Sequence, residues 1–323
     1  MDMQYRRLGR SGMKISEIGL GSWLTYGHES VDDETAKACV RKAVELGINF
    51  FDTADVYAAG AAETFLGEQL KQYRRSSIVL ATKCHGSIHD DPNGRGGSRK
   101  HVVEACEESL KRLQTDYIDL YQCHWYDPGT PIDETARAMD DLIRQGKVLY
   151  WGVSNYSAAQ VHAALTVCEA MGLDRPISHQ PRYNMLQREV EHELLDVCGQ
   201  EGLGLVVYCP LAQGVLTGKY SGGKTAKGTR GDWQKPDTSI GRLLAQPAVL
   251  AKVDALRPVA KKLSLSMAQL ALAWCLRQWQ LGCVIIGASK PEQIEGNCGA
   301  AGIKLEADVL EQIETILTDE QSG

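Results

Sequence analysis

Residues 78–83 read IVLATK, a run that is apolar on successive positions and ends on a lysine. Successive apolar residues are typical of a parallel strand covered on both faces, whereas a strand with one wet face alternates. Seven more short apolar runs resemble it, at 18–21, 48–52, 117–123, 148–153, 177–180, 203–208 and 283–286. The sequence therefore predicts eight buried parallel strands.

Segments with helical spacing lie between these runs, and the clearest covers residues 132–145. Its apolar side chains share one face, namely Ile132, Ala136, Met139, Leu142 and Ile143. Thr130 and Asp133 predict a capping box around Pro131 at the start of the helix. Gly146 stands where a helix commonly ends in the left-handed conformation. Similar helix ends are expected at Gly47, Gly172 and Gly202.

Strands that alternate with helices at close spacing require right-handed crossovers, and eight of them favour a closed barrel over an open sheet. An open dinucleotide-binding sheet would carry GxGxxG after its first strand, but residues 19–24 read GLGSWL. We expect an α/β protein, a (β/α)8 TIM barrel forming one domain over residues 1–323. Residues 1–16 should form a β-hairpin at the bottom of the barrel. Residues 216–247, after the seventh strand, should form a long cover loop.

Polar side chains close three of the predicted strands, at the barrel end where active sites lie. They are Asp52, Lys83 and His124, and Tyr57 follows five residues after Asp52. Each alone has an ordinary structural explanation: a turn cap, a solvated strand end, a packed histidine or a loop aromatic. Together at one mouth, they form a set with a specific chemical logic.

This logic is general acid catalysis by a tyrosine. A tyrosine hydroxyl with an ordinary pKa of about 10 can protonate a carbonyl oxygen but recovers poorly near neutrality. A lysine ammonium about 4 Å away would stabilise the phenolate by roughly 4 kcal/mol and lower its pKa by up to about three. Lys83 could act on Tyr57 in this way. Asp52 would keep Lys83 charged, provided that Asp52 lies farther from Tyr57.

Several short sequence motifs, spread over almost the whole chain, resemble those of the aldo-keto reductase superfamily. They are DTADVY at 52–57, ATK at 81–83, His124-Trp125, GVSN at 152–155 and the strand end at Gln180. Other motifs are most similar to the beta subunits of voltage-gated potassium channels and their bacterial relatives, including the glyceraldehyde-phosphate reductase type. These are GSRK at 97–100, TPIDET at 130–135, PLAQG at 210–214, LTGKY at 216–220 and LAWCLR at 272–277.

The resemblance implies NADPH-dependent reduction of a small carbonyl substrate, in which Tyr57 protonates the oxygen and His124 orients the carbonyl. It assigns Ser154, Asn155 and Gln180 to the nicotinamide carboxamide, and Tyr208 to its ring. It assigns Lys219 and Arg230 to the phosphates, and Ser289, Gln293 and Asn297 to the adenosine end, near a helix N-terminus. A solvated loop or barrel packing is the alternative for several of them. The remaining cofactor residues that it implies are Gly21, Ser22, Trp23, Asp52, Pro210, Leu211, Ala212, Gln213 and Gly287.

Two departures from the family pattern bear on function. Channel beta subunits usually have asparagine where this chain has His124, so the histidine favours genuine turnover. Gly296 stands where many relatives have a glutamate toward the adenine, which weakens the match at that end. The alternative function is an NADPH-binding, redox-sensing regulatory subunit with little turnover. The resemblance also allows a homo-oligomer.

Aromatic residues near strand ends could line a substrate pocket with Tyr57 and His124. They are Trp23, Trp125 and Tyr126. Packing within the barrel is an equally good explanation for Trp23, and the sequence leaves the physiological carbonyl open.

The composition excludes several other classes of protein. The chain has 323 residues, 43% hydrophobic and 24% charged, with a formal charge of -6, so no general basic field attracts nucleic acid or anionic lipid. No apolar h-region follows Met1, and no apolar stretch nears the roughly 20 residues of a membrane span, so we expect a soluble protein that is not exported. Ten cysteines without a CxxC pair are typical of reduced cytoplasmic thiols. Cys84, His85 and His89 include zinc-binding types, but no fourth ligand has suitable spacing, so we expect no metal.

Overall fold

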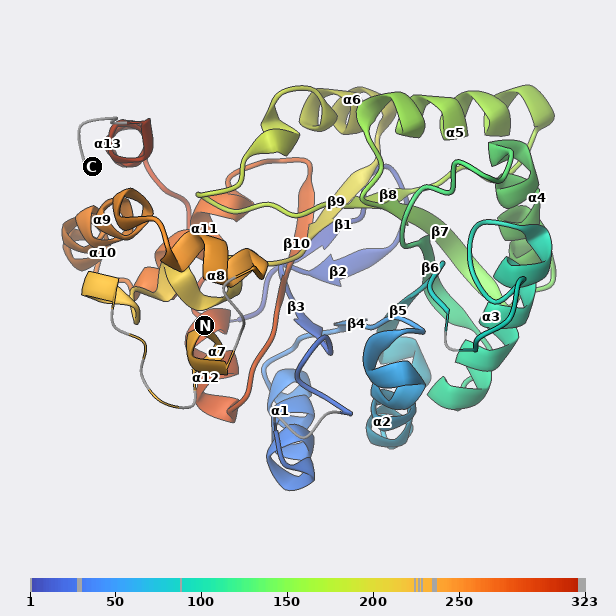
Figure 1. The fold of residues 1–323 in the computed structure, drawn as a ribbon, viewed down its shortest axis with the longest axis horizontal. Helices are drawn as coiled ribbons and strands as arrows, with labels where there is room; N and C mark the ends of the chain where they lie inside the picture. The colour runs from blue at the N-terminus through green and yellow to red at the C-terminus, as the bar shows by residue number, and fades with distance from the viewer. Residues whose placement is uncertain are drawn as a thin grey trace.

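The computed structural model describes residues 2–27, 31–87, 89–223, 225, 227, 229–233 and 237–318. Its eight parallel strands close into a barrel in the order β10-β3-β4-β5-β6-β7-β8-β9 (Figure 1). Their bounds are β3 (Ile18–Gly21), β4 (Phe50–Asp52), β5 (Val79–Cys84), β6 (Ile118–Cys123), β7 (Val148–Ser154), β8 (Ser178–Gln180), β9 (Gly204–Val207) and β10 (Leu281–Ile286). The predicted (β/α)8 barrel is confirmed, with each strand at or within two residues of its expected place.

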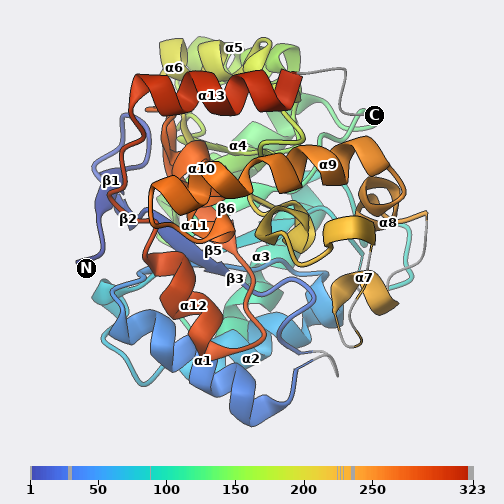
Figure 2. The same cartoon turned by 90° about the vertical axis from the view of Figure 1, so that its left-hand side faces the viewer.

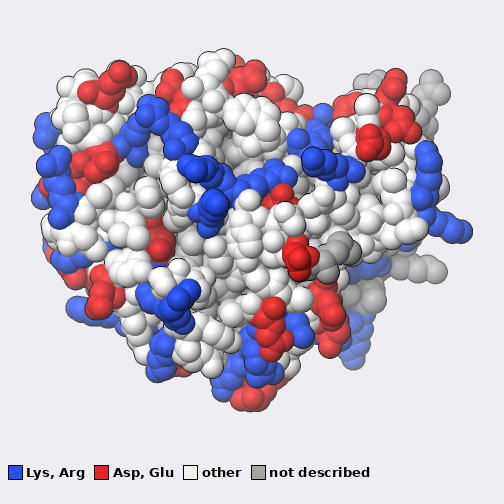
Figure 3. Space-filling model, turned by 180° about the vertical axis from the view of Figure 1, so that it is seen from behind, with Lys and Arg blue, Asp and Glu red and all other residues white. Residues whose placement is uncertain are grey.

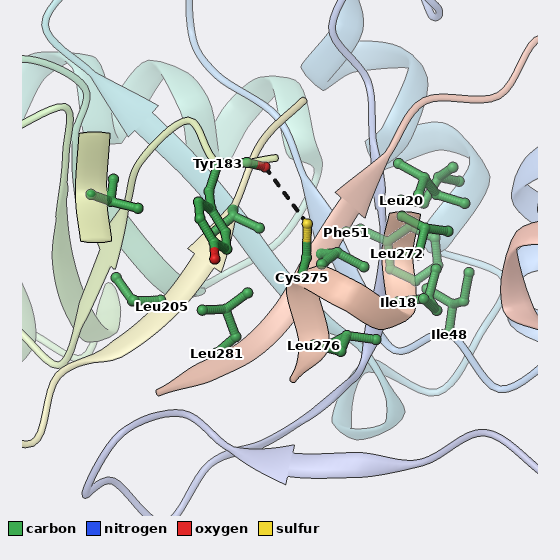
Figure 4. Close-up of a cluster of buried hydrophobic side chains, with 14 of the residues drawn as sticks. Ile18, Leu20, Ile48, Phe51, Tyr183, Leu205, Leu272, Cys275, Leu276 and Leu281 are labelled. Carbon is green, nitrogen blue, oxygen red and sulfur yellow. Dashed lines mark hydrogen bonds between the residues drawn. The ribbon is translucent and has the colours of Figure 1, made fainter. Parts of the chain in front are cut away.

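Helices surround the barrel (Figures 1 and 2). They include α1 (Asp33–Glu45), α2 (Ala61–Leu70), α3 (Arg99–Leu113), α4 (Ile132–Arg144), α5 (Ala158–Met171), α6 (Leu194–Glu201), α9 (Pro247–Ala255), α10 (Arg257–Lys262), α11 (Met267–Leu276), α12 (Pro291–Cys298) and α13 (Ala307–Thr318). Figure 2 shows α13 lying beside α9 and α10. Figure 4 shows how the outer core forms, with Leu272 and Leu276 of α11 beside Ile18 of β3. Each leucine buried in this way stabilises the fold by roughly 1.5–3 kcal/mol.

An antiparallel hairpin of β1 (Tyr5–Arg7) and β2 (Lys14–Ser16) closes the end of the barrel where strands begin. Leu8 and Ile15 are fully buried in the inner core, where they pack with strand residues that point into the barrel. The Arg6 guanidinium donates to the Leu276 and Leu281 carbonyl oxygens at 3.0 Å each. The predicted hairpin is thus confirmed at the bottom of the barrel, away from the mouth.

The helix ends follow the sequence signals more closely than the helix starts do. Gly146 has φ +72° after α4, in the left-handed region that glycine adopts without steric cost. The predicted capping box at the start of α4 is wrong, because Pro131 occupies the cap position and no side chain caps it. The Thr130 hydroxyl instead donates to Asp127 Oδ2 at 2.7 Å. The Asp127 carboxylate also accepts from the Gly97 and Gly129 amides, so it holds Thr130 in the loop rather than at the helix start.

The segment after β9 is partly helical rather than an open loop. It contains η4 (Ala212–Thr217), η5 (Ser221–Gly223), α7 (Arg230–Trp233) and α8 (Ser239–Leu244). Leu216, Tyr220 and Ile240 are fully buried, so apolar side chains pin this segment to the body of the protein. Residues 224, 226, 228 and 234–236 of the expected cover loop lie outside the described part of the chain.

Charged side chains of both signs are interspersed on the face drawn in Figure 3. This mixing agrees with the small net charge of -6. Among the described residues, we find no helix with the length and apolar character needed to cross a bilayer.

Candidate active site

The mouth of the barrel holds a buried ion pair, Asp52 with Lys83. Lys83 Nζ lies 2.7 Å from Asp52 Oδ2 and also donates to the Thr53 carbonyl oxygen at 2.6 Å. Its third contact is the Tyr57 hydroxyl, at 3.4 Å. The three groups therefore occur in the order Asp52, Lys83, Tyr57, which is the order that the chemistry requires.

Strand register explains why these residues meet. Asp52, the last residue of β4, is the partner of Ala81 in β5. Side chains alternate along a strand, so Lys83 points to the same side as Ala81, which lies in the inner core of the barrel. Tyr57 opens the short η1 helix (Tyr57–Gly60), directly after the loop that leaves β4. The backbone of this loop is tied to β5, where the Asp55 amide donates to the Lys83 carbonyl oxygen at 3.2 Å.

The electrostatics of Tyr57 differ from the sequence-based expectation. Burial raises the pKa of Tyr57 to about 12, although the Lys83 ammonium acts to lower it. The expected net fall in the Tyr57 pKa is therefore wrong for the protein alone, because the cost of burying the phenolate exceeds its attraction to Lys83. Burial disfavours the charged form of Lys83 as well, but Asp52 and Tyr57 outweigh this and raise the Lys83 pKa above its ordinary value.

His124 lies beside Tyr57, with the two ring centroids 5.8 Å apart and the rings nearly perpendicular. It follows β6 directly, and its backbone amide donates to the Cys84 carbonyl oxygen at 2.9 Å. Burial, with help from the Lys83 charge, lowers the pKa of His124 to about 3. The ring is therefore neutral near pH 7 and can donate one hydrogen bond without adding a charge.

A second polar network adjoins the ion pair on the opposite side from Tyr57. Gln180 Nε2 donates to Asp52 Oδ1 at 2.8 Å, and the Ser154 hydroxyl donates to the Gln180 carbonyl oxygen at 2.8 Å. The Tyr208 hydroxyl donates to Asn155 Oδ1 at 2.8 Å. Asn155 Nδ2 in turn reaches the His124 carbonyl oxygen at 3.1 Å. Strand ends from β4 to β9 are thus joined in one network.

Sequence reasoning missed Gln122, which lies within this network. Gln122 is the register partner of Lys83 on β6, and its Oε1 atom accepts from Gln180 Nε2 at 3.4 Å. Its Nε2 atom is buried and has no hydrogen-bond partner among the described residues. A polar residue inside the apolar run 118–123 was the available signal. A buried unpaired donor of this kind suits a ligand that brings an acceptor.

The sequence matches the family model of the Aldo/keto reductase family over residues 17–318. The chain belongs to the aldo/keto reductase family. A protein of Oryza sativa subsp. japonica named "Probable voltage-gated potassium channel subunit beta" is 41% identical over 320 residues, covering 98% of this chain and 97% of that protein. An Arabidopsis thaliana protein of the same name is likewise 41% identical over 320 residues, with the same coverage. The resemblance predicted from the sequence is confirmed, and membership of the family implies oxidoreductase activity.

In this aldo/keto reductase, the residues expected around the nicotinamide and its linker lie around the barrel mouth. Gly21 ends β3, Gly287 directly follows β10, and the Ser22 hydroxyl donates to Thr53 Oγ1 at 2.8 Å. The expected linker residues form the turn after β9 and the start of η4, namely Pro210, Leu211, Ala212 and Gln213.

The two cations expected at the phosphates lack acidic partners in the described part of the chain. Lys219 Nζ lies over the Tyr220 ring, 5.1 Å from its centroid, and the Arg230 guanidinium lies 5.6 Å from the Trp23 centroid. Neither forms an ion pair with a carboxylate of the described residues. Burial lowers the pKa of Arg230. Because a partly buried cation without a counter-ion is costly, these side chains fit a site for phosphate groups.

The expected adenosine end lies at the start of α12. The Ser289 amide donates to Gln293 Oε1 at 2.8 Å, and Asn297 is buried on the same helix. A Cβ atom at Gly296 would meet nothing within 4 Å, so the space for a larger side chain is open there. This matches the missing glutamate noted in the sequence.

The aromatic residues expected at the substrate pocket differ in exposure. Trp23 is 41% exposed and Trp125 is 50% exposed, while Tyr126 packs edge-on against Tyr156 with centroids 5.3 Å apart. Trp23 therefore does not fill the barrel interior, which removes that alternative. The Trp125 ring stacks against His124 with the centroids 6.1 Å apart, and so borders the residue expected to orient the carbonyl.

Cys84, His85 and His89 do not come together as a metal site. Cys84 is buried against the Gln122 carbonyl oxygen, while His89 pairs with Glu108 at 3.5 Å on the outside. No group of three metal-binding side chains occurs within the described ranges.

Proposed function

We propose that this aldo/keto reductase uses NADPH to reduce aldehydes and ketones to alcohols, with Tyr57 as the general acid. The observation that carries the proposal is the buried ion pair of Asp52 and Lys83 beside the Tyr57 hydroxyl. A buried, charged lysine beside a tyrosine stabilises the phenolate that forms when the tyrosine loses its proton during the reaction.

Residues of the chain are available for each part of the cofactor, although Gly296 leaves the adenine contact weaker than in many relatives. Ser154, Asn155, Gln180 and Tyr208 would hold the nicotinamide end, and Lys219 with Arg230 would hold the phosphates. Ser289, Gln293 and Asn297 would hold the adenosine end. When bound, NADPH supplies the hydride that reduces the carbonyl carbon. Two observations support this assignment: the buried Gln122 Nε2 atom has no hydrogen-bond partner among the described residues, and burial lowers the pKa of Arg230.

The proton steps belong to the chain itself. Tyr57 donates its hydroxyl proton to the carbonyl oxygen as negative charge develops there. His124, which is neutral because its pKa is about 3, donates a hydrogen bond to the same oxygen and orients it. Lys83 then stabilises the phenolate on Tyr57, and Asp52 keeps Lys83 charged and fixed. Tyr57 is only half-buried, so water can return the proton afterwards.

Tyr57→Phe tests the proposal, because this change removes only the proton donor. The variant should lose NADPH oxidation with a panel of glyceraldehyde, methylglyoxal and 4-nitrobenzaldehyde, while its Kd for NADPH stays within about twofold. Tyr73→Phe serves as the matched control, because Tyr73 lies in the turn that follows α2. This variant should keep full activity. Near-normal turnover in Tyr57→Phe would show that another group supplies the proton.

A second candidate function rests on the names of the relatives, which describe potassium channel beta subunits. Under this alternative the chain binds NADPH as a redox-sensing regulatory subunit of a channel or other partner. His124 favours turnover, as the resemblance implies. Tight NADPH binding without turnover on any aldehyde of the panel would support the regulatory subunit instead. All ten cysteines are free, which supports a reducing, cytoplasmic location for either function.

A further inference from the structure

We propose that Arg182 binds a phosphoryl group of the cofactor, a role that rests on the proposed function and that no motif of the sequence assigns. Arg182 lies two residues beyond Gln180, where β8 and β9 continue pairing past the sheet. An isolated parallel bridge makes Arg182 the register partner of Tyr208. The Tyr208 amide donates to the Pro181 carbonyl oxygen at 3.1 Å, which fixes this register.

The direction of the Arg182 side chain follows from the register. Side chains two residues apart on an extended segment point the same way. Gln180 points into the barrel, where its amide reaches Asp52 at 2.8 Å. Arg182 therefore lies one layer above Gln180 at the mouth, and its guanidinium carbon is 5.6 Å from the centroid of the Tyr208 ring.

Arg182 has no counter-ion at this position. Its Nε atom is buried and has no hydrogen-bond partner among the described residues. None of the ion pairs formed by those residues includes it. Arg182 is half-buried and its guanidinium already interacts with the Tyr208 side chain. The buried Nε–H is nevertheless costly without an acceptor, so an acceptor from outside the chain is the simplest partner for that donor.

Arg182 and Arg230 come from different elements, and each lies near enough to Cys209 for its charge to act on the thiol. The positive charges of both act on the Cys209 thiol, opposing the rise in the Cys209 pKa that burial causes. Arg182 comes from the end of β8, and Arg230 comes from α7. The planar fork of a guanidinium matches a phosphoryl group with two parallel hydrogen bonds, and a dinucleotide cofactor offers two such groups in its diphosphate.

The barrel order favours the cofactor over a phosphorylated substrate as the source of this group. In the order β10-β3-β4-β5-β6-β7-β8-β9, β8 lies across the barrel from β4. Tyr57, the proposed proton donor, follows β4, so Arg182 and Tyr57 come from opposite strands of the barrel. The neighbour of Arg182 is Tyr208, which the proposed function assigns to the nicotinamide ring.

The test compares Arg182→Met and Arg182→Lys with the surface control Arg41→Met, whose side chain is 65% exposed on α1. We expect Arg182→Met to weaken NADPH binding by about 10-fold to 100-fold, measured by fluorescence titration. Arg182→Lys keeps the charge but loses the fork, so it should fall between wild type and Arg182→Met. The rate at saturating NADPH should change by less than about threefold, because Arg182 lies away from the proton donor.

Thermal unfolding without cofactor gives an independent readout. Removal of a cation whose buried Nε–H has no acceptor should leave the melting temperature of Arg182→Met equal to or above that of wild type, whereas the loss of a structural contact would lower it. If Arg182→Met does not fold, Arg182→Lys decides the question. A folded Arg182→Lys protein with the intermediate Kd for NADPH would support the proposal, and any other result would overturn it.

The remaining outcomes separate the two sources of phosphate. An NADPH Kd within twofold of wild type in Arg182→Met would overturn the proposal. A rise in KM for glyceraldehyde 3-phosphate but not for glyceraldehyde, with an unchanged Kd for NADPH, would overturn it in favour of the substrate. Failure of the wild-type protein to bind NADPH would overturn the proposed function as well, which distinguishes that failure from a failure of Arg182 alone.

Discussion

Lys83 Nζ lies 2.7 Å from Asp52 Oδ2, and the two side chains are 0% and 5% exposed. Removing one partner of such a pair leaves a buried charge without compensation, which costs about 3–5 kcal/mol. We therefore expect Lys83→Met to lower the free energy of unfolding by this amount in urea titrations. It should also abolish aldehyde reduction, with any remaining activity shifted to higher pH.

The double variant Asp52→Asn, Lys83→Met separates stability from chemistry, because it removes both charges. It should recover most of the lost stability and none of the activity. Lys100→Met is the control, since Lys100 pairs with Glu104 on the surface and should change stability by less than about 1 kcal/mol. An unchanged stability in Lys83→Met would show that the Asp52 charge finds another partner.

The pKa of about 12 for Tyr57 predicts opposite pH profiles for the two directions of the reaction. Reduction needs the protonated phenol, so its kcat/KM should not fall as pH rises from 6 to 9. Alcohol oxidation needs the phenolate, so its rate should rise by about tenfold per pH unit over the same range. Initial rates in both directions in one buffer series measure this. A reduction rate that falls around pH 7 would contradict the assignment of Tyr57 as the acid.

His124 should add no ionisation to these profiles near neutrality, because its pKa is about 3. His124→Asn offers an amide donor with a different reach, and we expect the rate of reduction to fall by about tenfold or more while the NADPH Kd is kept. His162→Asn, on the exposed face of α5, is the matched control. Equal rates for His124→Asn and wild type would remove the main argument against a purely regulatory subunit.

The sequence predicted the architecture well because a parallel barrel leaves a strong local signal. Strands covered on both faces must be apolar on successive residues, and the polar residues that end them are then conspicuous, as Asp52 and Lys83 are. Gln122 was missed because a single polar residue within an apolar strand has no evident role in the sequence alone. Its role becomes visible only when its register with Lys83 is known. The turn chemistry at Thr130 also depended on a distant partner, since Asp127 competes for its hydroxyl.

The net pKa shifts of the site residues were less predictable from the sequence than the positions of their side chains. Pair distances could be guessed from strand ends, and Lys83 does lie beside the Tyr57 hydroxyl. The depth of burial could not be guessed, and it decides the sign of the net change in the Tyr57 pKa. Arg182 illustrates the same limit, because only the three-dimensional structure shows that its Nε atom is buried without a hydrogen-bond partner among the described residues.

Asp55 lies between Asp52 and Tyr57 in the sequence, and its ionisation should make the free energy of unfolding depend on pH. Burial, followed by the nearby Glu63 charge, raises the Asp55 pKa to about 7. Between about pH 4 and pH 7 the unfolded chain releases this proton while the folded chain keeps it, so the contribution of Asp55 to stability falls as pH rises. The penalty is absent below pH 4 and complete above pH 7, where it reaches at most about 4 kcal/mol.

Asp55→Asn removes the ionisation while keeping an oxygen that can accept from the Val56 amide, as Asp55 does at 2.7 Å. The stability gained over wild type should therefore be smallest at pH 4 and grow until about pH 7, as measured by urea unfolding at each pH. Asp90→Asn, at an exposed loop position, should give a difference that hardly varies with pH. If the Asp55→Asn difference were also constant with pH, Asp55 would have to be ionised across the whole range, held in that state by Arg112 and Lys83, whose charges act to lower its pKa.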